Sequence, residues 1–483
     1  MLDEGLLAKL GVARIRTPLP TAKMAIVHAA AGLLRLEDSA SVTWNALLDW
    51  IAGLELESEV AEGLCIAVLA KDAAVVSVPD LQRSIRRPSV LSDLFFAQLT
   101  GHPVLFNAWL RAHSGPTRPF FQSKSILDDL EAGYTVPPIL YHAFLDLEET
   151  SGRPLLSHWA YECERLEQRL GRQSDGQPSY FQEHSRDETD RGPFIARRGH
   201  VARSAYLRTL AYACEAWGMP EDVARTRALV AGPVDFHLLP MIPCSPPPWA
   251  NALYGAQPSD QQSLQHTVDQ LVDRIAQERD PRTIGYLDTA LPYGPRYRAD
   301  IQITTALETG ATCTASDIFR ALDRLPGAVE IPRTRRSFDL RKTNQIAAIE
   351  NAKGGLALPA VLPCLGSSIG YFHADLIERI PYLPANYSLD QPVMATPRKG
   401  GADVTIGDTK VGELSYWSVA WRPTHDARLG PRCAVSLTMD PEQFKAMLQV
   451  PGARIRLAWR AKVLSRNDDY GSFEIRNLEG FVD

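Results

Sequence analysis

The spacing of apolar residues changes along the chain, and this change constrains the fold more than any other feature. From Leu6 to about Arg172 the apolar residues recur at the i, i+3, i+4 spacing of amphipathic helices, with breaks at proline and glycine. From Gly354 onward the pattern is typical of strands, most clearly from Arg454 to Leu464, where arginines alternate with apolar residues. The sequence therefore predicts a multi-domain protein, with a mainly α-helical N-terminal part and a β-rich (α+β) C-terminal module.

The positions of the expected elements follow from the same spacing. We expect helices in the N-terminal part at 22–36, 44–54, 59–76, 90–113, 139–149 and 155–170. Further helices are expected at 201–217, 221–230, 259–279, 315–325, 344–352 and 442–448. We expect the strands of the C-terminal module at 356–365, 411–421, 433–438, 454–464 and 472–477.

The length of the chain indicates more than one folding unit. A chain of 483 residues is larger than one hydrophobic core usually serves, and 45% hydrophobic residues supply apolar surface for several cores. The segment 172–200 is polar, charged and nearly free of aliphatic residues, so it cannot bury enough surface to fold alone. We expect a helical domain at 1–171, a flexible loop or linker at 172–200, a helical or mixed domain at 201–353 and the β-rich module at 354–483.

The segment 232–258 is dense in proline, which forbids a long helix or a central strand. It also carries large apolar residues, among them Phe236, Leu238, Met241 and Trp249, which need cover from the rest of the protein. We therefore expect a proline-rich strap that lies along a surface groove of the chain. A ligand for an SH3-type domain is the alternative.

The charge balance argues against general phosphate binding. The chain has 51 basic and 57 acidic residues, a formal net charge of −6, and so lacks the global basic character of many nucleic-acid-binding proteins. Its longest apolar run, Gly63 to Val78, is interrupted by Lys71 and Asp72 and is too short to cross a bilayer. The first residues carry acids where a signal peptide carries bases, so we expect a cytoplasmic protein with no membrane partner.

The cysteines and the familiar nucleotide and metal motifs give no sign of a cofactor. The seven cysteines include no C-x-x-C pair, so we expect buried free thiols and no metal site. The sequence contains no Walker A loop, no G-x-G-x-x-G after a strand and no H-E-x-x-H. We therefore expect no cofactor.

One short pattern could carry nucleophilic catalysis. The run Gly366–Gly370 fits G-x-S-x-G, in which a strand-to-helix turn exposes a serine hydroxyl, here that of Ser368. Asp390 or Asp403, followed by His425, would complete a triad in the order serine, acid, histidine. The alternative is a glycine-serine turn without catalysis, because prolines interrupt the preceding strand and most of the chain before it is expected to be helical.

Arg153 and His158 stand at R-x4-H spacing. This spacing resembles the active-site motif of HEPN ribonucleases, and the resemblance implies an arginine and a histidine that act on the 2′-hydroxyl and phosphate of RNA. Pro154 departs from that pattern, because the family carries both residues within one helix and proline would place Arg153 at or before the helix start. The alternative for His158 is a packing residue on the helix.

A basic cluster could contact phosphates, with Phe338 inside it available for stacking. Its members are Arg333, Arg335, Arg336, Arg341 and Lys342. The arginines of 454–464 offer a second basic face. A solvated surface or a salt-bridged rim is the alternative in both cases.

Because the catalytic motifs are weak, we interpret the chain as a non-enzymatic assembly or interaction subunit of a cytoplasmic multi-protein complex, with other protein subunits as partners. Trp417, Trp421 and Trp459 are the interface candidates, although tryptophan in a half-buried sheet often belongs to the core. One alternative is a hydrolase or nuclease with a dispersed active site. Another is a nucleic-acid-binding subunit that uses the arginine clusters.

Overall fold

The structure is a computed structural model, and it describes only part of the chain. The described residues are 4–18, 20–103, 107–113, 115–118, 124–133, 135–171, 195, 197–246, 262, 266, 268–270, 272, 283–292, 296–309, 314–322, 356–357, 360–361, 370–373, 382–383, 393–418, 433–442, 446, 453–468 and 473–482. All structural statements below refer to these residues.

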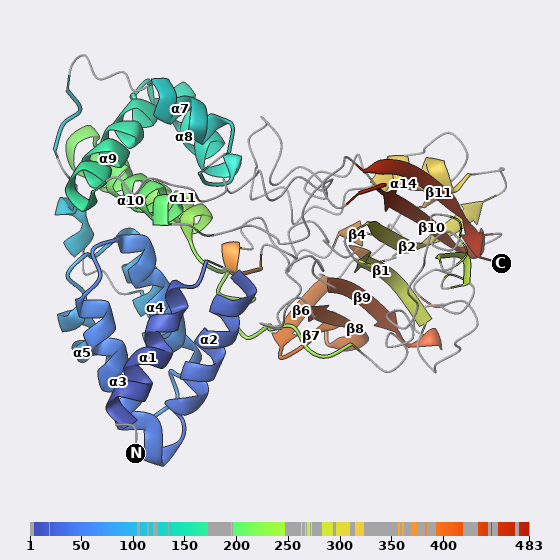
Figure 1. The fold of residues 1–483 in the computed structure, drawn as a ribbon, viewed down its shortest axis with the longest axis horizontal. Coiled ribbons are helices and arrows are strands. Elements are labelled where there is room, and N and C mark those ends of the chain that lie inside the picture. Colours follow the sequence, from blue (N-terminus) through green and yellow to red (C-terminus); the bar gives the residue numbers. More distant parts are fainter. Residues whose placement is uncertain are drawn as a thin grey trace.

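The first helices form a bundle at the N-terminal end of the molecule (Figure 1). They are α1 (Glu4–Ala13), η1 (Arg14–Arg16), α2 (Pro20–Leu33), α3 (Glu37–Ala52), α4 (Glu57–Leu69), α5 (Val78–Ser84) and α6 (Val90–Thr100). The expected helix at 90–113 is too long, because Gly101 adopts a left-handed conformation (φ 71°) and its N–H bonds to the carbonyl of Ala97, which ends α6. The segment continues as the separate short helix η2 (Ala108–Arg111).

A second group of helices packs above the first in Figure 1. It comprises α7 (Lys124–Glu131), α8 (Pro138–Ser151), α9 (Leu155–Leu170), α10 (Arg197–Trp217), α11 (Glu221–Ala228) and η3 (Leu229–Ala231). Aromatic side chains bind these helices together: the rings of Phe144 and Tyr206 stack with centroids 3.9 Å apart, and Trp159 Nε1 donates to the carbonyl of Ala202 at 2.7 Å. Helix α10, which is buried from Gly199 to Ala211, begins within the linker expected at 172–200.

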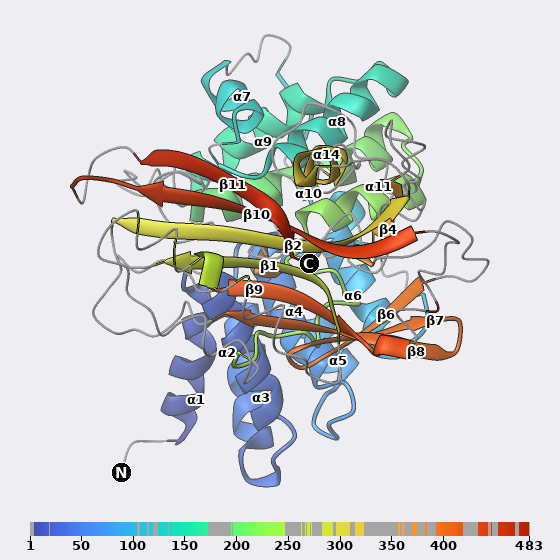
Figure 2. The same ribbon diagram turned by 90° about the vertical axis from the view of Figure 1, so that its right-hand side faces the viewer.

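The C-terminal half contains an antiparallel sheet, and Figure 2 shows one face of it with the strands side by side. Its strands run in the order β11-β10-β2-β1-β9-β8-β7-β6, and β3 pairs with β2. The bounds are β1 (Thr283–Pro292), β2 (Tyr297–Thr309), β3 (Leu356–Ala357), β6 (Val393–Arg398), β7 (Gly401–Ile406), β8 (Thr409–Ser418), β9 (Cys433–Met439), β10 (Ala453–Ser465) and β11 (Glu474–Val482). Two short strands, β4 (Ala360–Val361) and β5 (Tyr382–Leu383), form a separate pair.

The predicted fold class is confirmed, since a helical N-terminal region is followed by a β-rich module. The part of the chain that forms the sheet begins before Gly354, where the β-rich module is expected to start. Strands β1 and β2 precede that residue and lie in the middle of the sheet, between β9 and β10. The helix α14 (Ala315–Leu322) also precedes it and packs against β10 and β11.

The described part of the proline-rich strap, 232–246, lies against both halves. Its Leu238 and Met241 are buried in a core that combines residues of the helices and of β7 to β9. On the helical side, Phe236 packs edge-to-face on Phe95. On the sheet side, the N–H of Cys244 donates to the carbonyl of Tyr416 at 3.0 Å. The strap therefore joins the two halves through both side-chain packing and backbone hydrogen bonds.

Among the residues that the structure describes, no helix has both the length and the apolar character needed to cross a membrane.

Candidate functional site

A group of buried polar side chains lies where α2, α4, α10 and η6 (Tyr371–His373) meet. We call it the junction cluster, and its members are Lys23, Ser58, Glu62, His200, Arg203 and Tyr371. The guanidinium of Arg203 lies over the ring of Tyr371, 4.4 Å from its centroid. Because an isolated charge is costly to bury, these side chains need partners within the cluster.

Glu62 is the centre of the junction cluster. The Nζ of Lys23 lies 2.8 Å from the Glu62 carboxylate and also donates to the carbonyl of Ile15 at 2.7 Å. The hydroxyl of Tyr371 donates to Glu62 Oε1 at 2.9 Å. Burial raises the pKa of Glu62, and the charge of Lys23 opposes that rise. Since Tyr371 follows the first strands of the sheet in the chain, these bonds tie the C-terminal half to the helices.

Three members of the cluster line up as hydroxyl, imidazole and carboxylate. Ser58 Oγ lies 3.0 Å from His200 Nδ1, and His200 Nε2 lies 3.6 Å from Glu62 Oε1. The same groups in the same order serve nucleophilic hydrolases. Ser58 is only 1% exposed, however, so a substrate carbonyl cannot reach its hydroxyl in this structure. Burial lowers the pKa of His200 well below its ordinary value, so the ring is neutral at neutral pH.

A second histidine cluster surrounds His158 on α9. Its Nδ1 is hydrogen-bonded to Thr117 Oγ1, and its ring stacks on Tyr212 with centroids 4.2 Å apart. Burial lowers the pKa of His158 to about 4. Arg153 is exposed and precedes α9, which begins at Leu155, so the arginine and the histidine do not share one helix. The two residues thus depart from the HEPN-like arrangement in the way that Pro154 indicates.

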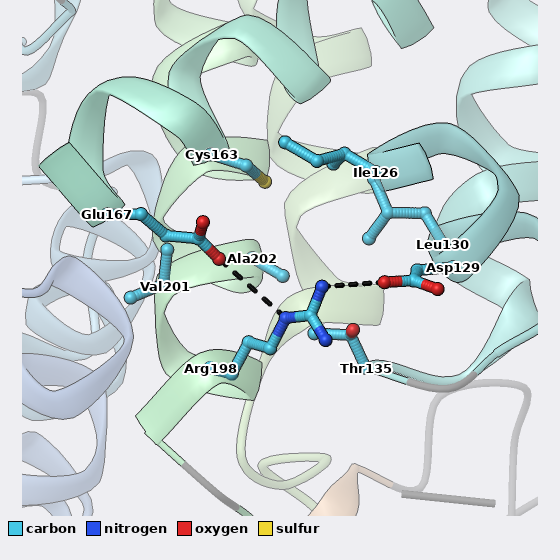
Figure 3. Close-up of a pocket in the computed structure, with 9 residues that line it drawn as sticks. All are labelled: Ile126, Asp129, Leu130, Thr135, Cys163, Glu167, Arg198, Val201 and Ala202. Carbon is cyan, nitrogen blue, oxygen red and sulfur yellow. Dashed lines mark hydrogen bonds and ion pairs between the residues drawn. The ribbon is translucent and has the colours of Figure 1, made fainter. Parts of the chain in front are cut away.

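A small pocket opens between α7, α9 and α10 (Figure 3). The space between its lining atoms, open solvent included, is about 230 Å³, and the guanidinium of Arg198 spans it. The guanidinium of Arg198 lies 2.6 Å from the carboxylate of Asp129 and 3.7 Å from that of Glu167, so the two carboxylates of the pocket share one cation. Burial raises the pKa of the Cys163 thiol well above its ordinary value, which keeps this sulfur protonated and unreactive.

The residues of the predicted triad are not brought together by the described structure. Three of the candidates, Ser368, His425 and Asp390, lie outside the described residues. The catalytic triad therefore stays a prediction. Asp403 is described, on β7, where its carboxylate lies 2.9 Å from the Nζ of Lys410. This pairing lowers the pKa of Asp403.

The predicted basic cluster also stays a prediction, because all its members lie outside the described residues: Arg333, Arg335, Arg336, Arg341 and Lys342. The second basic face is described in part. On β10 the guanidinium of Arg456 lies 4.0 Å from the ring centroid of Phe481, and that of Arg460 lies 4.7 Å from the ring of Phe319 on α14. Arg460 also donates to Gln302 at 2.8 Å. These arginines therefore contribute to packing within the sheet module.

The three tryptophans proposed for an interface have different positions. Trp417 on β8 is fully buried in a core that it shares with Leu287 of β1 and Ile301 of β2, so it offers no surface to a partner in this structure. Trp421 lies outside the described residues. Trp459 on β10 is half-buried and packs beside Gly480 of the neighbouring strand β11.

The most exposed apolar helix surface lies on α1, which the expected helices did not include. Leu6, Leu7 and Leu10 are 47%, 48% and 54% exposed. At about 100° per residue these leucines share one side of the helix. The opposite side carries Ala8 and Val12, which pack on the core. The leucine spacing was present in the sequence as a signal, since Leu7 and Leu10 are three apart and Leu6 and Leu10 are four apart.

The charges of α1 lie beside the leucine side and leave it uninterrupted. Glu4 and Lys9 project on its two flanks at the same angular spacing, and Lys9 Nζ pairs with Asp49 of α3 at 2.9 Å. Directly after the helix, Arg14 and Arg16 are exposed. We call Leu6, Leu7 and Leu10 the leucine stripe.

In the described part of the chain, no three histidine, cysteine, aspartate or glutamate side chains converge as metal ligands. Comparison with known proteins adds no assignment: no protein-family model matches the chain, and no curated protein shows significant similarity to it.

Proposed function

We propose that this chain is a non-enzymatic assembly subunit of a cytoplasmic protein complex, and that it docks through the leucine stripe of α1 into an apolar groove of a partner protein. The observation that carries the proposal is a helix with three leucines about half exposed on the side that faces away from the core. Soluble proteins seldom leave a contiguous apolar surface uncovered unless it serves an interaction.

The stripe has the form that helix-binding grooves recognise. In that mode an amphipathic helix inserts apolar anchors that are three and four residues apart, as Leu10 is from Leu7 and from Leu6. The exposed Arg14 and Arg16 follow the stripe at the C-terminal end of α1. The matching partner surface is therefore an apolar groove with carboxylates at one end.

The stripe can supply a useful share of the binding energy. Complete burial of a leucine contributes about 2 kcal/mol, so burying the exposed half of each contributes about 1 kcal/mol. Three such side chains give about 3 kcal/mol, which corresponds to roughly a hundredfold in affinity.

The experiment compares the unmodified chain with a Leu6→Gln, Leu7→Gln, Leu10→Gln variant. Glutamine keeps the helix propensity close to that of leucine and removes the apolar side chains. A partner recovered from the native source is purified, and its dissociation constant is measured with each chain. We expect the variant to bind roughly a hundredfold more weakly.

The matched control changes exposed leucines outside α1. Leu33 and Leu36, at the connection between α2 and α3, are 42% and 58% exposed. Their replacement by glutamine should leave the dissociation constant unchanged. Equal binding by the unmodified chain and the α1 variant contradicts the proposal, as does a partner whose contact surface lacks an apolar groove.

The hydrolase, nuclease and nucleic-acid alternatives remain predictions. Their main candidate residues, Ser368 and the cluster from Arg333 to Lys342, lie outside the described parts of the chain.

A further inference from the structure

The two edges of the sheet differ in how they are protected. At one edge β6 is six residues long and contains Pro397, which cannot donate a backbone hydrogen bond. The adjacent Arg398 adds charge, and short strands, proline and charge are the usual means of blocking further pairing. At the other edge β11 is nine residues long and contains no proline, and its charged residues, Glu474, Arg476 and Glu479, are of both signs and so can be paired with one another or with polar groups across a strand.

Among the described strands, β11 forms backbone hydrogen bonds with a neighbour along only one of its two edges. It pairs with β10 from Glu474 to Val482, and no described strand pairs with its other side. Ile475 is 47% exposed, and Arg476, Asn477 and Glu479 are exposed as well. An edge of this kind is a template for the addition of a further strand.

We propose that β11 pairs with β11 of a second copy of this chain, antiparallel, about a two-fold axis that passes through Leu478 perpendicular to the sheet. Such an axis continues the sheet of one protomer into the sheet of the other. Both protomers then contribute the same surface to the interface, as a closed symmetric dimer requires.

The axis position follows from the sequence of β11. With Leu478 on the axis, Ile475 lies opposite Phe481 and Asn477 lies opposite Glu479, so apolar residues meet apolar ones and no like charges are paired. An axis between two residues is excluded, because opposite residues would then project on different faces of the sheet.

The neighbouring axis positions are less favourable. An axis at Glu479 would place two carboxylates opposite each other, and one at Arg476 would do so with two guanidinium groups. An axis at Asn477 would place Ile475 opposite Glu479. Axes nearer the ends of β11 pair too few residues.

The half-buried Trp459 supplies a second contribution. A Cβ on Gly480 would lie 3.0 Å from Trp459 Nε1, so the indole covers this glycine. In the proposed register Gly480 lies opposite Arg476 of the partner subunit. The absence of a side chain at Gly480 lets that guanidinium reach the indole, and a cation–π contact follows.

Cysteine cross-linking tests the register in the full chain. Directly opposite residues in an antiparallel pair have Cβ atoms about 5 Å apart, so a Leu478→Cys variant should form a disulfide across the axis under mild oxidation. An Arg476→Cys variant is the matched control. Its two sulfurs would be offset by four residues, about 13 Å along the strand, and should not link. The unmodified chain gives the background from its native cysteines.

Analytical ultracentrifugation gives a second readout that does not depend on a change at the half-buried Leu478. We expect the unmodified chain to sediment as a dimer at micromolar concentration and an Ile475→Lys variant as a monomer with unchanged circular dichroism. The triple α1 variant should remain a dimer, which separates this inference from the proposed function. A monomeric unmodified chain, or equal cross-linking at positions 478 and 476, overturns the proposal.

Discussion

Replacing Lys23 by methionine removes the charge that pairs with Glu62 and keeps a side chain of similar length. Both members of this pair are about 1% exposed, and removal of one partner from a buried pair costs about 3–5 kcal/mol. Glu62 keeps the hydrogen bond from Tyr371 at 2.9 Å, and burial already raises its pKa, so it can take up a proton instead of remaining charged. The carbonyl of Ile15 loses its donor. We therefore expect a loss near the lower end, about 3 kcal/mol.

The assay is equilibrium unfolding in urea at neutral pH, followed by circular dichroism. A second substitution, Glu62→Gln, removes the unpaired charge and should restore part of the stability lost in Lys23→Met. Lys9→Met is the matched control, because the Lys9–Asp49 pair has side chains 59% and 65% exposed and should contribute less than about 1 kcal/mol. The reasoning is refuted if Lys23→Met costs no more than Lys9→Met, or if Glu62→Gln brings no recovery.

Two further predictions concern the same region of the molecule. Burial lowers the pKa of His373 to about 4, and its Nε2 donates to the carbonyl of Met241. In the unfolded chain the imidazole of His373 takes up a proton near its ordinary pKa of about 6.5. The free energy of unfolding therefore keeps the full contribution of neutral His373 above about pH 6.5 and falls by about 2 kcal/mol at pH 5. The raised pKa of Glu62 has the opposite effect, because it makes the folded chain more stable as the pH falls. The contribution of His373 is therefore measured as the difference in unfolding free energy between the unmodified chain and a His373→Gln variant. The same pH dependence in both chains would contradict this prediction. Gly370→Ala should prevent normal packing of η6, since Gly370 has φ 79° and a Cβ would lie 2.4 Å from Val234 Cα. A melting temperature equal to that of the unmodified chain would contradict this.

The helical half could be predicted because its signal is local. The buried residues of α9, among them Leu155, Trp159 and Leu166, recur at helical spacing, and the predicted helix at 155–170 has the bounds of α9. The strand β2 has a comparable signal, since buried Ala299, Ile301 and Ile303 alternate with polar residues, although the sequence around it predicts a helical or mixed domain at 201–353. The central position of β2 depends on pairing with β10, about 150 residues later, which no local pattern reports.

The junction cluster could not be predicted from the sequence. Its residues come from four separate elements, and only the fold brings Lys23, Glu62, His200 and Tyr371 within reach of one another. A lysine in a mostly apolar helix, as Lys23 is in α2, was the one available hint that a buried partner must exist. The leucine stripe was readable from the first ten residues, but its exposure depends on which side of α1 packs on the core.

The most direct test of the docking proposal measures the solvent exposure of the leucine stripe in the assembled complex. Hydroxyl-radical footprinting followed by mass spectrometry reports the reactivity of individual side chains in the free chain and in the complex purified with its partner. We expect Leu6, Leu7 and Leu10 to lose most of their reactivity on assembly, while Leu33 and Leu36 keep theirs. Unchanged reactivity of the three α1 leucines in a complex that is otherwise intact would contradict docking through this helix.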